Sequence, residues 1–97
     1  MEKSVKAIRL DKLDNVVTVI QAVSPGTVVR WSDDPEDELT AQADIPRFHK
    51  MAIADIEQGA VIRKYGNTIG AATQPIVKGT HVHTHNCAGT AVEELMS

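Results

Sequence analysis

Apolar residues along this chain come in short runs, and each run is bounded by residues that favour turns. Gly, Pro and Asn recur between the runs, as in Ser24-Pro25-Gly26 and Tyr65-Gly66-Asn67. Short apolar segments separated by such turns are typical of strands, and the three-to-four-residue periodicity of an amphipathic helix is hard to find. The pattern therefore predicts an all-β domain with short strands and Gly-centred turns. The expected strands cover residues 5–10, 16–23, 27–31, 51–56, 60–62, 68–73 and 80–82.

One short pattern, apolar-x-x-Gly-x-x-apolar, occurs three times, starting at Val23, Ile56 and Ile76. We interpret it as a turn leading into a strand, in which Gly supplies a backbone angle that a Cβ atom disfavours. The unequal spacing of the copies argues against a stacked solenoid. It favours one turn type used repeatedly in a compact β structure, with three unrelated Gly turns as the alternative.

The length of 97 residues supports one domain, which we place at residues 1–87, followed by a tail at 88–97 that is a frayed helix or disordered. Val, Ile and Ala supply most of the hydrophobic residues, and β-branched side chains favour strands. A domain of this size has room for a core but little for a deep pocket as well. We therefore expect it to contribute one wall of a site that a partner chain completes.

Charge and cysteine content restrict the function further. The net charge is −3, and no basic stripe points to nucleic acid. The acidic run at 33–38 lacks the spacing of a calcium loop, so we expect a solvated loop that extends outward.

No apolar run is long enough for a signal peptide or a membrane span, and Cys87 is the single cysteine. A cytoplasmic protein is expected, with Cys87 a free and inert thiol rather than a reactive one or a metal ligand.

The most distinctive segment is Gly79-Thr80-His81-Val82-His83-Thr84-His85-Asn86. Alternate residues of a strand share a face, which would place His81, His83 and His85 together. Three ligands on one straight strand would strain the reach to one ion, so we expect two of them plus a group from elsewhere, such as His49 or a partner chain. Imidazole suits iron, manganese or zinc. A solvent-facing histidine row without an ion, or an adventitious nickel site, is the alternative.

His49 and Lys50 follow a Pro46 turn and precede an apolar strand. A lysine beside a histidine can orient a substrate carboxylate or act in proton transfer, so both are candidate catalytic residues. An exposed pair at a strand end is the alternative.

Between Asp14 and Asn86 the ordered combination of these motifs closely resembles the SAF domain of the altronate/galactarate dehydratase family, which implies a β-clip fold. The resemblance is carried by the segment 45–56, Gly59 with Val61-Ile62, Lys64-Tyr65-Gly66, Ile69-Gly70, Ala72-Thr73, Ile76, Gly79 and the segment 81–86.

The resemblance implies a hydro-lyase that eliminates water from a sugar acid in a reaction dependent on Fe(II) or Mn(II). Catalysis would need a large catalytic subunit or region in addition to this chain, which alone would be inactive. His49-Lys50 matches the family's His-Lys step, and His81, His83 and His85 match its C-terminal histidine cluster, which the galactarate branch does not keep. The resemblance implies a hydroxy-acid substrate, and association of several copies of the chain stays open.

Three further functions remain as alternatives. In some relatives the SAF part is a separate polypeptide, as in the small subunit of sulfolactate sulfo-lyase, so altronate, galactarate and sulfolactate all remain candidate substrates. Related β-clip domains also act as non-catalytic binding or chaperone modules. A free-standing metal-binding or regulatory protein is a third reading.

Overall fold

The fold consists of short strands joined by turns. The computed structural model describes residues 4–88, and these contain nine strands and no helix. The all-β prediction is therefore confirmed. The described part of the chain contains no helix with the length and apolar character that a membrane crossing requires. The strands are β1 (Ser4–Ile8), β2 (Val16–Val19), β3 (Val28–Arg30), β4 (Glu38–Thr40), β5 (Lys50–Ala52), β6 (Val61–Lys64), β7 (Asn67–Ala72), β8 (His81–Val82) and β9 (Cys87–Ala88).

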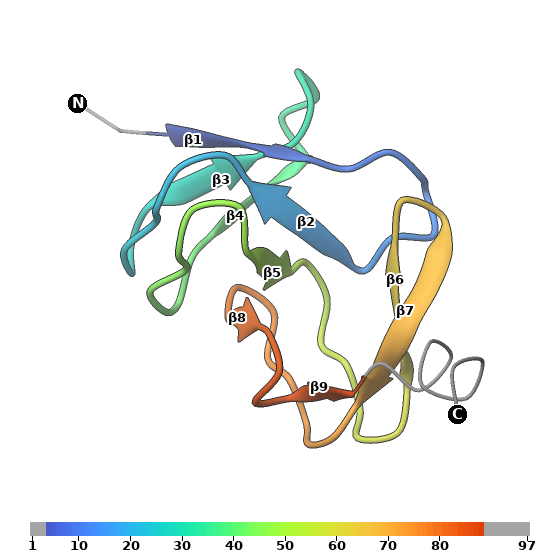
Figure 1. Ribbon diagram of the computed structural model, residues 1–97. Helices are drawn as coiled ribbons and strands as arrows, with labels where there is room; N and C mark the ends of the chain where they lie inside the picture. The colour runs from blue at the N-terminus through green and yellow to red at the C-terminus, as the bar shows by residue number, and fades with distance from the viewer. Residues whose placement is uncertain (1–3, 89–97) are drawn as a thin grey trace.

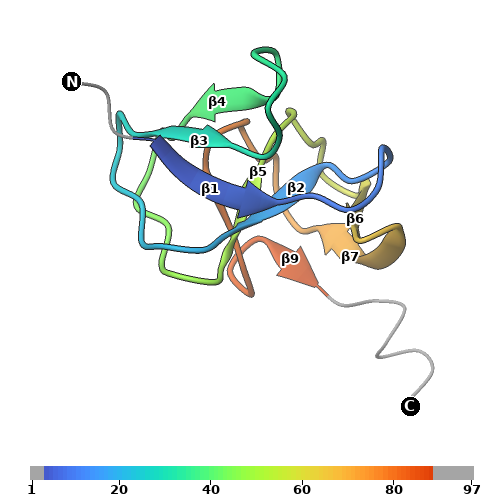
Figure 2. The ribbon, with the colours of Figure 1, turned by 90° about the horizontal axis from the view of Figure 1, so that it is seen from above.

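The strands form two sheets (Figures 1 and 2). The larger sheet has the order β4-β3-β1-β2-β5-β8, and the smaller has the order β6-β7-β9. Within the larger sheet β1 pairs in parallel with β3, and its other neighbour β2 is antiparallel. The order means that β5 and β8, which are far apart in sequence, are neighbours at one edge of the larger sheet.

Two hydrophobic cores lie on either side of β2, whose four residues are all buried. Val17 and Val19 pack in the first core, whereas Val16 packs in the second, as the alternation of a strand requires. Thr18 is also buried, and its hydroxyl accepts a hydrogen bond from Tyr65 at 3.3 Å. The first core contains Val5, Ala7, Val17, Val19, Val23, Val29, Ala41, Ile45 and Met51, and the second contains Val16, Ala52, Ile56, Ile62, Ala72, Ile76 and Val82.

The repeated turn predicted from sequence is present, and the structure adds a fourth copy. Its apolar first residues pair with one another, Val23 with Ile45 and Ile56 with Ile76, through isolated antiparallel bridges. In each copy the residue four places after the apolar one donates its N–H to a carbonyl three residues earlier, at 2.9–3.2 Å. The left-handed position of this turn is occupied by Gly26, Gly59 and Gly79 in the three expected copies, with φ of 91°, 87° and 88°.

In the fourth copy Phe48 occupies that position, with a φ of 66°. Sequence inspection did not identify this copy, because the pattern was defined by its glycine. Left-handed backbone is unfavourable for a bulky residue. The Phe48 side chain is 60% exposed, with the Arg47 guanidinium 4.4 Å from its ring centroid. This turn leads directly into His49.

Several strands are shorter than expected, because the chain leaves the sheet to make these turns. The predicted strand 16–23 ends at Val19, and the predicted strand 51–56 is reduced to β5, which starts at Lys50. Ile53 has already turned away from the sheet, and its N–H donates to the carbonyl of Asn15 at 3.0 Å.

Two strands were not predicted. In β4 the single apolar residue Leu39 pairs with Val29, and Glu38 forms an ion pair of 3.6 Å with Arg30. Residues 33–36 are exposed, as expected of a solvated loop, but Glu38 belongs to the strand. In β9, Ala88 pairs with Ala71, although the sequence analysis placed residue 88 in the tail. The remaining tail residues, 89–97, lie outside the described part of the chain.

Candidate functional site

Three histidines from two distant segments meet at the edge formed by β5 and β8. His49, His81 and His83 each offer one ring nitrogen within 4.8 Å of the other two. The shortest separation is 2.9 Å, between Nδ1 of His49 and Nε2 of His81. We call these three residues the histidine triad.

The register of β5 and β8 explains why His49 joins the other two. Met51 pairs with His81 in this antiparallel ladder, so their side chains lie on the same face. His49 stands two residues before Met51 and shares that face by alternation. Lys50 pairs with Val82 and faces the other way. The adjacent residues His49 and Lys50 therefore lie on opposite faces of β5, and only His49 is on the face of His81.

The expectation that residues 81–85 form one extended strand is wrong, because β8 ends at Val82. The buried side chain of Asn86 accepts a hydrogen bond from the N–H of His83 at 2.9 Å and donates one to the carbonyl of His81 at 2.8 Å. Its own N–H donates to the His83 carbonyl at 3.0 Å. An Asn side chain can replace the ladder bonds of a strand in this way, and here it closes a turn.

The turn still keeps the histidine rings together. The His83 ring stacks on that of His49 with centroids 4.4 Å apart, and lies nearly parallel to that of His81 at 5.6 Å. His85 is exposed, and its ring lies 5.3 Å from that of His81. His85 is not part of the triad, and its predicted role as a ligand stays a prediction.

The surroundings of His81 and His83 favour their neutral imidazole forms. Burial, followed by the neighbouring His49, His85 and His83, lowers the pKa of His81 to about 4. Burial also lowers the pKa of His83, with further contributions from His49 and Lys50. A neutral imidazole keeps a lone pair that can coordinate a metal ion, whereas a protonated one does not.

The residues fit a divalent metal ion. Two nitrogens bound at about 2.1 Å and at right angles to each other are about 3.0 Å apart, close to the 2.9 Å between His49 and His81. Imidazole donors suit iron, manganese and zinc. Three protein ligands leave positions open for substrate, as in catalytic rather than structural sites.

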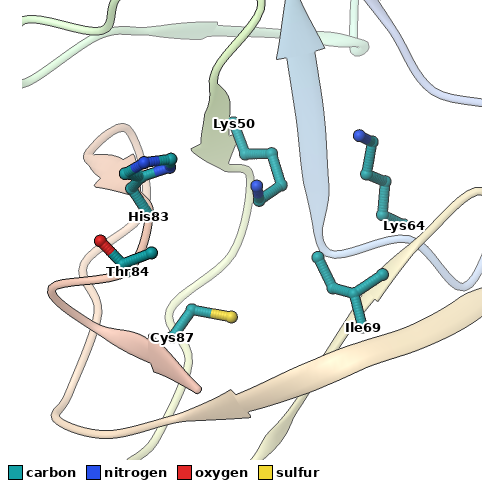
Figure 3. A pocket seen from close by; sticks show the side chains of 6 residues that line it. All are labelled: Lys50, Lys64, Ile69, His83, Thr84 and Cys87. Carbon is teal, nitrogen blue, oxygen red and sulfur yellow. The ribbon is translucent and has the colours of Figure 1, made fainter. Parts of the chain in front are cut away.

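A hollow of about 340 Å³ lies between β5 and the smaller sheet (Figure 3). His83 is the one member of the triad that lines it. Burial and then the charge of Lys64 lower the pKa of Lys50, while Cys87 acts in the opposite direction. The residues that line the hollow are Lys50, Lys64, Ile69, His83, Thr84 and Cys87.

Cys87 is free and half-buried in β9. Burial raises the pKa of its thiol, and Lys50 only partly opposes this effect. A raised pKa reduces the fraction of thiolate, the reactive form. This agrees with the expectation of an unreactive thiol.

Sequence reasoning found most of these residues but not their grouping. It named His49 as an outside partner for the histidine row and Lys50 as a carboxylate-binding candidate. It assigned no role to Lys64 or to Asn86. Lys64, in β6, lines the hollow opposite β5 because the two sheets pack beside each other. No local sequence pattern indicates this packing. An Asn directly after a histidine row is a local signal for a turn.

Comparisons with known proteins identify the family to which the chain belongs. The sequence model of the altronate/galactarate dehydratase SAF domain matches residues 5–90. Altronate dehydratase of Escherichia coli (strain K12) is 39% identical over 79 residues, which are 81% of this chain and 15% of that protein. The (2R)-sulfolactate sulfo-lyase subunit alpha of Paracoccus pantotrophus is 45% identical over 56 residues, which are 58% of this chain and 84% of that subunit.

A second subunit alpha of this name, from Chromohalobacter salexigens, is 36% identical over 73 residues and is covered over 78% of its length. The chain thus spans about 15% of the altronate dehydratase and most of each sulfo-lyase subunit alpha.

Proposed function

Because the chain belongs to the altronate/galactarate dehydratase SAF-domain family, we propose that it is the SAF domain or small subunit of a hydro-lyase dependent on Fe(II) or Mn(II). The reaction is the elimination of water from a sugar acid. A larger catalytic chain or region completes the active site, and this chain alone is inactive. The small share of altronate dehydratase that the chain spans supports this division.

The observation that carries the proposal is the histidine triad. Three imidazoles from two segments, with ring nitrogens within 4.8 Å of one another, form a ligand set that requires the folded domain. The lowered pKa values of His81 and His83 favour their neutral, metal-binding form. A metal ion bound there would supply Lewis acidity toward a carboxylate or hydroxyl group of the substrate.

The chain's own residues then have separate tasks. His49, His81 and His83 would hold the ion, and Asn86 fixes the turn that carries His83. Lys50, on the opposite face of β5, attracts a substrate carboxylate toward the hollow. Elimination also needs a base that removes the proton next to the carboxylate and an acid that protonates the leaving hydroxyl. We assign both to the larger chain.

A second candidate is the small subunit of a sulfo-lyase, in which sulfite rather than water leaves. The coverage of the two sulfo-lyase alpha subunits, 84% and 78% of their lengths, favours this function. Both candidates place the same triad beside the reacting acid, and they differ in the leaving group.

Calorimetric titration of the purified chain with Mn(II), and with Fe(II) under anaerobic conditions, tests the metal site. The double variant His81→Ala/His83→Ala is the test protein, and His85→Ala is the matched control because His85 lies outside the triad. We expect the double variant to lose binding and the control to retain it.

Lyase assays with a co-purified larger chain, on altronate, galactarate and sulfolactate, test the reaction. We expect activity only with both chains present, and loss of activity in the double variant. Metal binding and activity that are both unaffected in the double variant would refute the proposal. A chain that binds neither metal nor a larger chain would instead favour a non-catalytic β-clip module.

A further inference from the structure

Resting on the proposed function, we propose that the hollow beside the triad binds a second acidic group of the substrate. The substrate class is then a hydroxy acid with two acidic groups. One is the carboxylate next to the reacting carbon, and the other is a carboxylate or a sulfonate that lies between Lys50 and Lys64.

The first support is the position of the hollow. It is lined by side chains from both sheets: Lys50 from β5, Lys64 from β6 and Cys87 from β9. Figure 3 shows these side chains around a common space. His83 also lines it, and the same His83 ring stacks on His49 at 4.4 Å. A ligand in the hollow therefore lies directly beside the triad.

The second support is charge. Two lysines line the hollow, and no acidic side chain among residues 4–88 does. Within residues 4–88 the ion pair found is that of Arg30 with Glu38, so neither Lys50 nor Lys64 has a described carboxylate within 4.0 Å. Two ammonium groups near one another repel, and an anion between them would stabilise both.

Lys64 is held in place by its neighbour rather than by an acid. Its Nζ atom lies 4.9 Å from the ring centroid of Tyr65, and that ring is anchored through its hydroxyl to Thr18. A cation above an aromatic face keeps its charge available for an anion. The β6-β7 hairpin thus presents one cation to the hollow, and β5 presents the other.

The third support is size. About 340 Å³ is near the lower limit of small-molecule sites. Such a volume suits a small hydroxy acid, whose two ends would reach the triad and the two lysines together. A second anionic group in contact with Lys64 is worth up to about 1 kcal/mol, or roughly a fivefold difference in Kd.

The test is an NMR titration of the ¹⁵N-labelled chain of 97 residues, metal-free and loaded with Zn(II) as a diamagnetic substitute. The probes are malate, which has two carboxylates, lactate, which has one, and inorganic sulfate. We expect malate to shift the amide signals of Lys50, Lys64 and Cys87 and to bind about fivefold more tightly than lactate. Lys64→Gln should abolish this preference, whereas Lys78→Gln, a lysine outside the hollow, should retain it.

Equal Kd values for malate and lactate, or an unchanged preference in Lys64→Gln, would overturn the inference. Sulfate binding as tight as that of malate in the Zn(II)-loaded chain would also overturn it, since the hollow would then accept any anion. The metal-free arm separates the two proposals. If malate selects the lysine hollow but no metal binds to the triad, the proposed function fails and the inference about the hollow stands.

Discussion

Nδ1 of His49 lies 2.9 Å from Nε2 of His81, although 32 positions separate the two residues in the sequence. The pairing of Met51 with His81 brings them together, and the turn closed by Asn86 adds His83. The candidate metal site therefore depends on the register between β5 and β8. A histidine-rich peptide of the same local sequence would lack the contribution of His49.

The environment of His81 predicts an acid-sensitive fold in the metal-free chain. The pKa of His81 is about 4 when folded and near 6.5 when unfolded, so below pH 6.5 protons bind preferentially to the unfolded chain. The contribution of His81 to the free energy of unfolding is complete above pH 6.5 and decreases as the pH falls toward 4. Thermal unfolding at pH 7.5 and pH 4.5 measures this, and His81→Gln should show a smaller decrease. An equal decrease in the two proteins would contradict it.

Asn86→Ala should destabilise the chain and weaken metal binding together. The substitution removes the side-chain hydrogen bonds to His83 and His81 and leaves partly buried backbone groups without these partners, at a cost of about 1–3 kcal/mol. Chemical denaturation and Mn(II) titration measure the two effects. Asn67→Ala, in the exposed β6-β7 hairpin, is the control and should change neither by much. Unaltered Mn(II) affinity in Asn86→Ala would show that the turn does not position His83.

Phe48→Gly should stabilise the isolated chain. Phe48 has a φ of 66° at the position where the three other copies of the turn have Gly, and left-handed backbone costs a non-glycine residue about 1 kcal/mol. Its side chain is mostly exposed, so little packing is lost. The expected gain corresponds to roughly 4–8 °C in Tm. Phe48→Ala retains a Cβ atom and should not show this gain. A Tm for the Gly variant no higher than that of the Ala variant would contradict the assignment of strain.

Gly70→Ala should displace β9. A Cβ atom at position 70 would overlap the carbonyl of Ala88 and lie 3.1 Å from Sγ of Cys87. Overpacking of this kind costs about 1–3 kcal/mol. Chemical denaturation measures the loss of stability, and the rate of reaction of Cys87 with a thiol reagent should increase as β9 moves. Thr68→Ala, on the same strand, is the comparison. An unchanged thiol rate in Gly70→Ala would show that β9 does not depend on this close approach.

The fold was predictable in class because its signals are local. Short apolar runs and glycine turns are visible residue by residue, and they gave the all-β class and three of the four turns. The fourth turn was missed because Phe48 adopts an angle that the sequence alone assigns to Gly. β4 and β9 were missed because neither is apolar enough to stand out; each is stabilised by its pairing partner, Val29 for Leu39 and Ala71 for Ala88.

The site was predictable in content but not in geometry. Three histidines at alternate positions and one His-Lys step identified the residues, and the limited reach of one strand indicated that a ligand from elsewhere was needed. The register that selects His49 as that ligand depends on long-range pairing. The turn that separates His85 from the triad depends on a buried side chain, Asn86, whose two contacts exist only in the folded domain.

The most direct test of the account is to count the imidazoles bound to one ion. Pulsed electron paramagnetic resonance of the Mn(II)-loaded chain detects coordinated ring nitrogens. We predict three in the natural chain, two in His49→Ala, and three in His85→Ala. The absence of coordinated nitrogen in the natural chain, or an unchanged count in His49→Ala, would contradict the assignment of His49, His81 and His83 as one metal site.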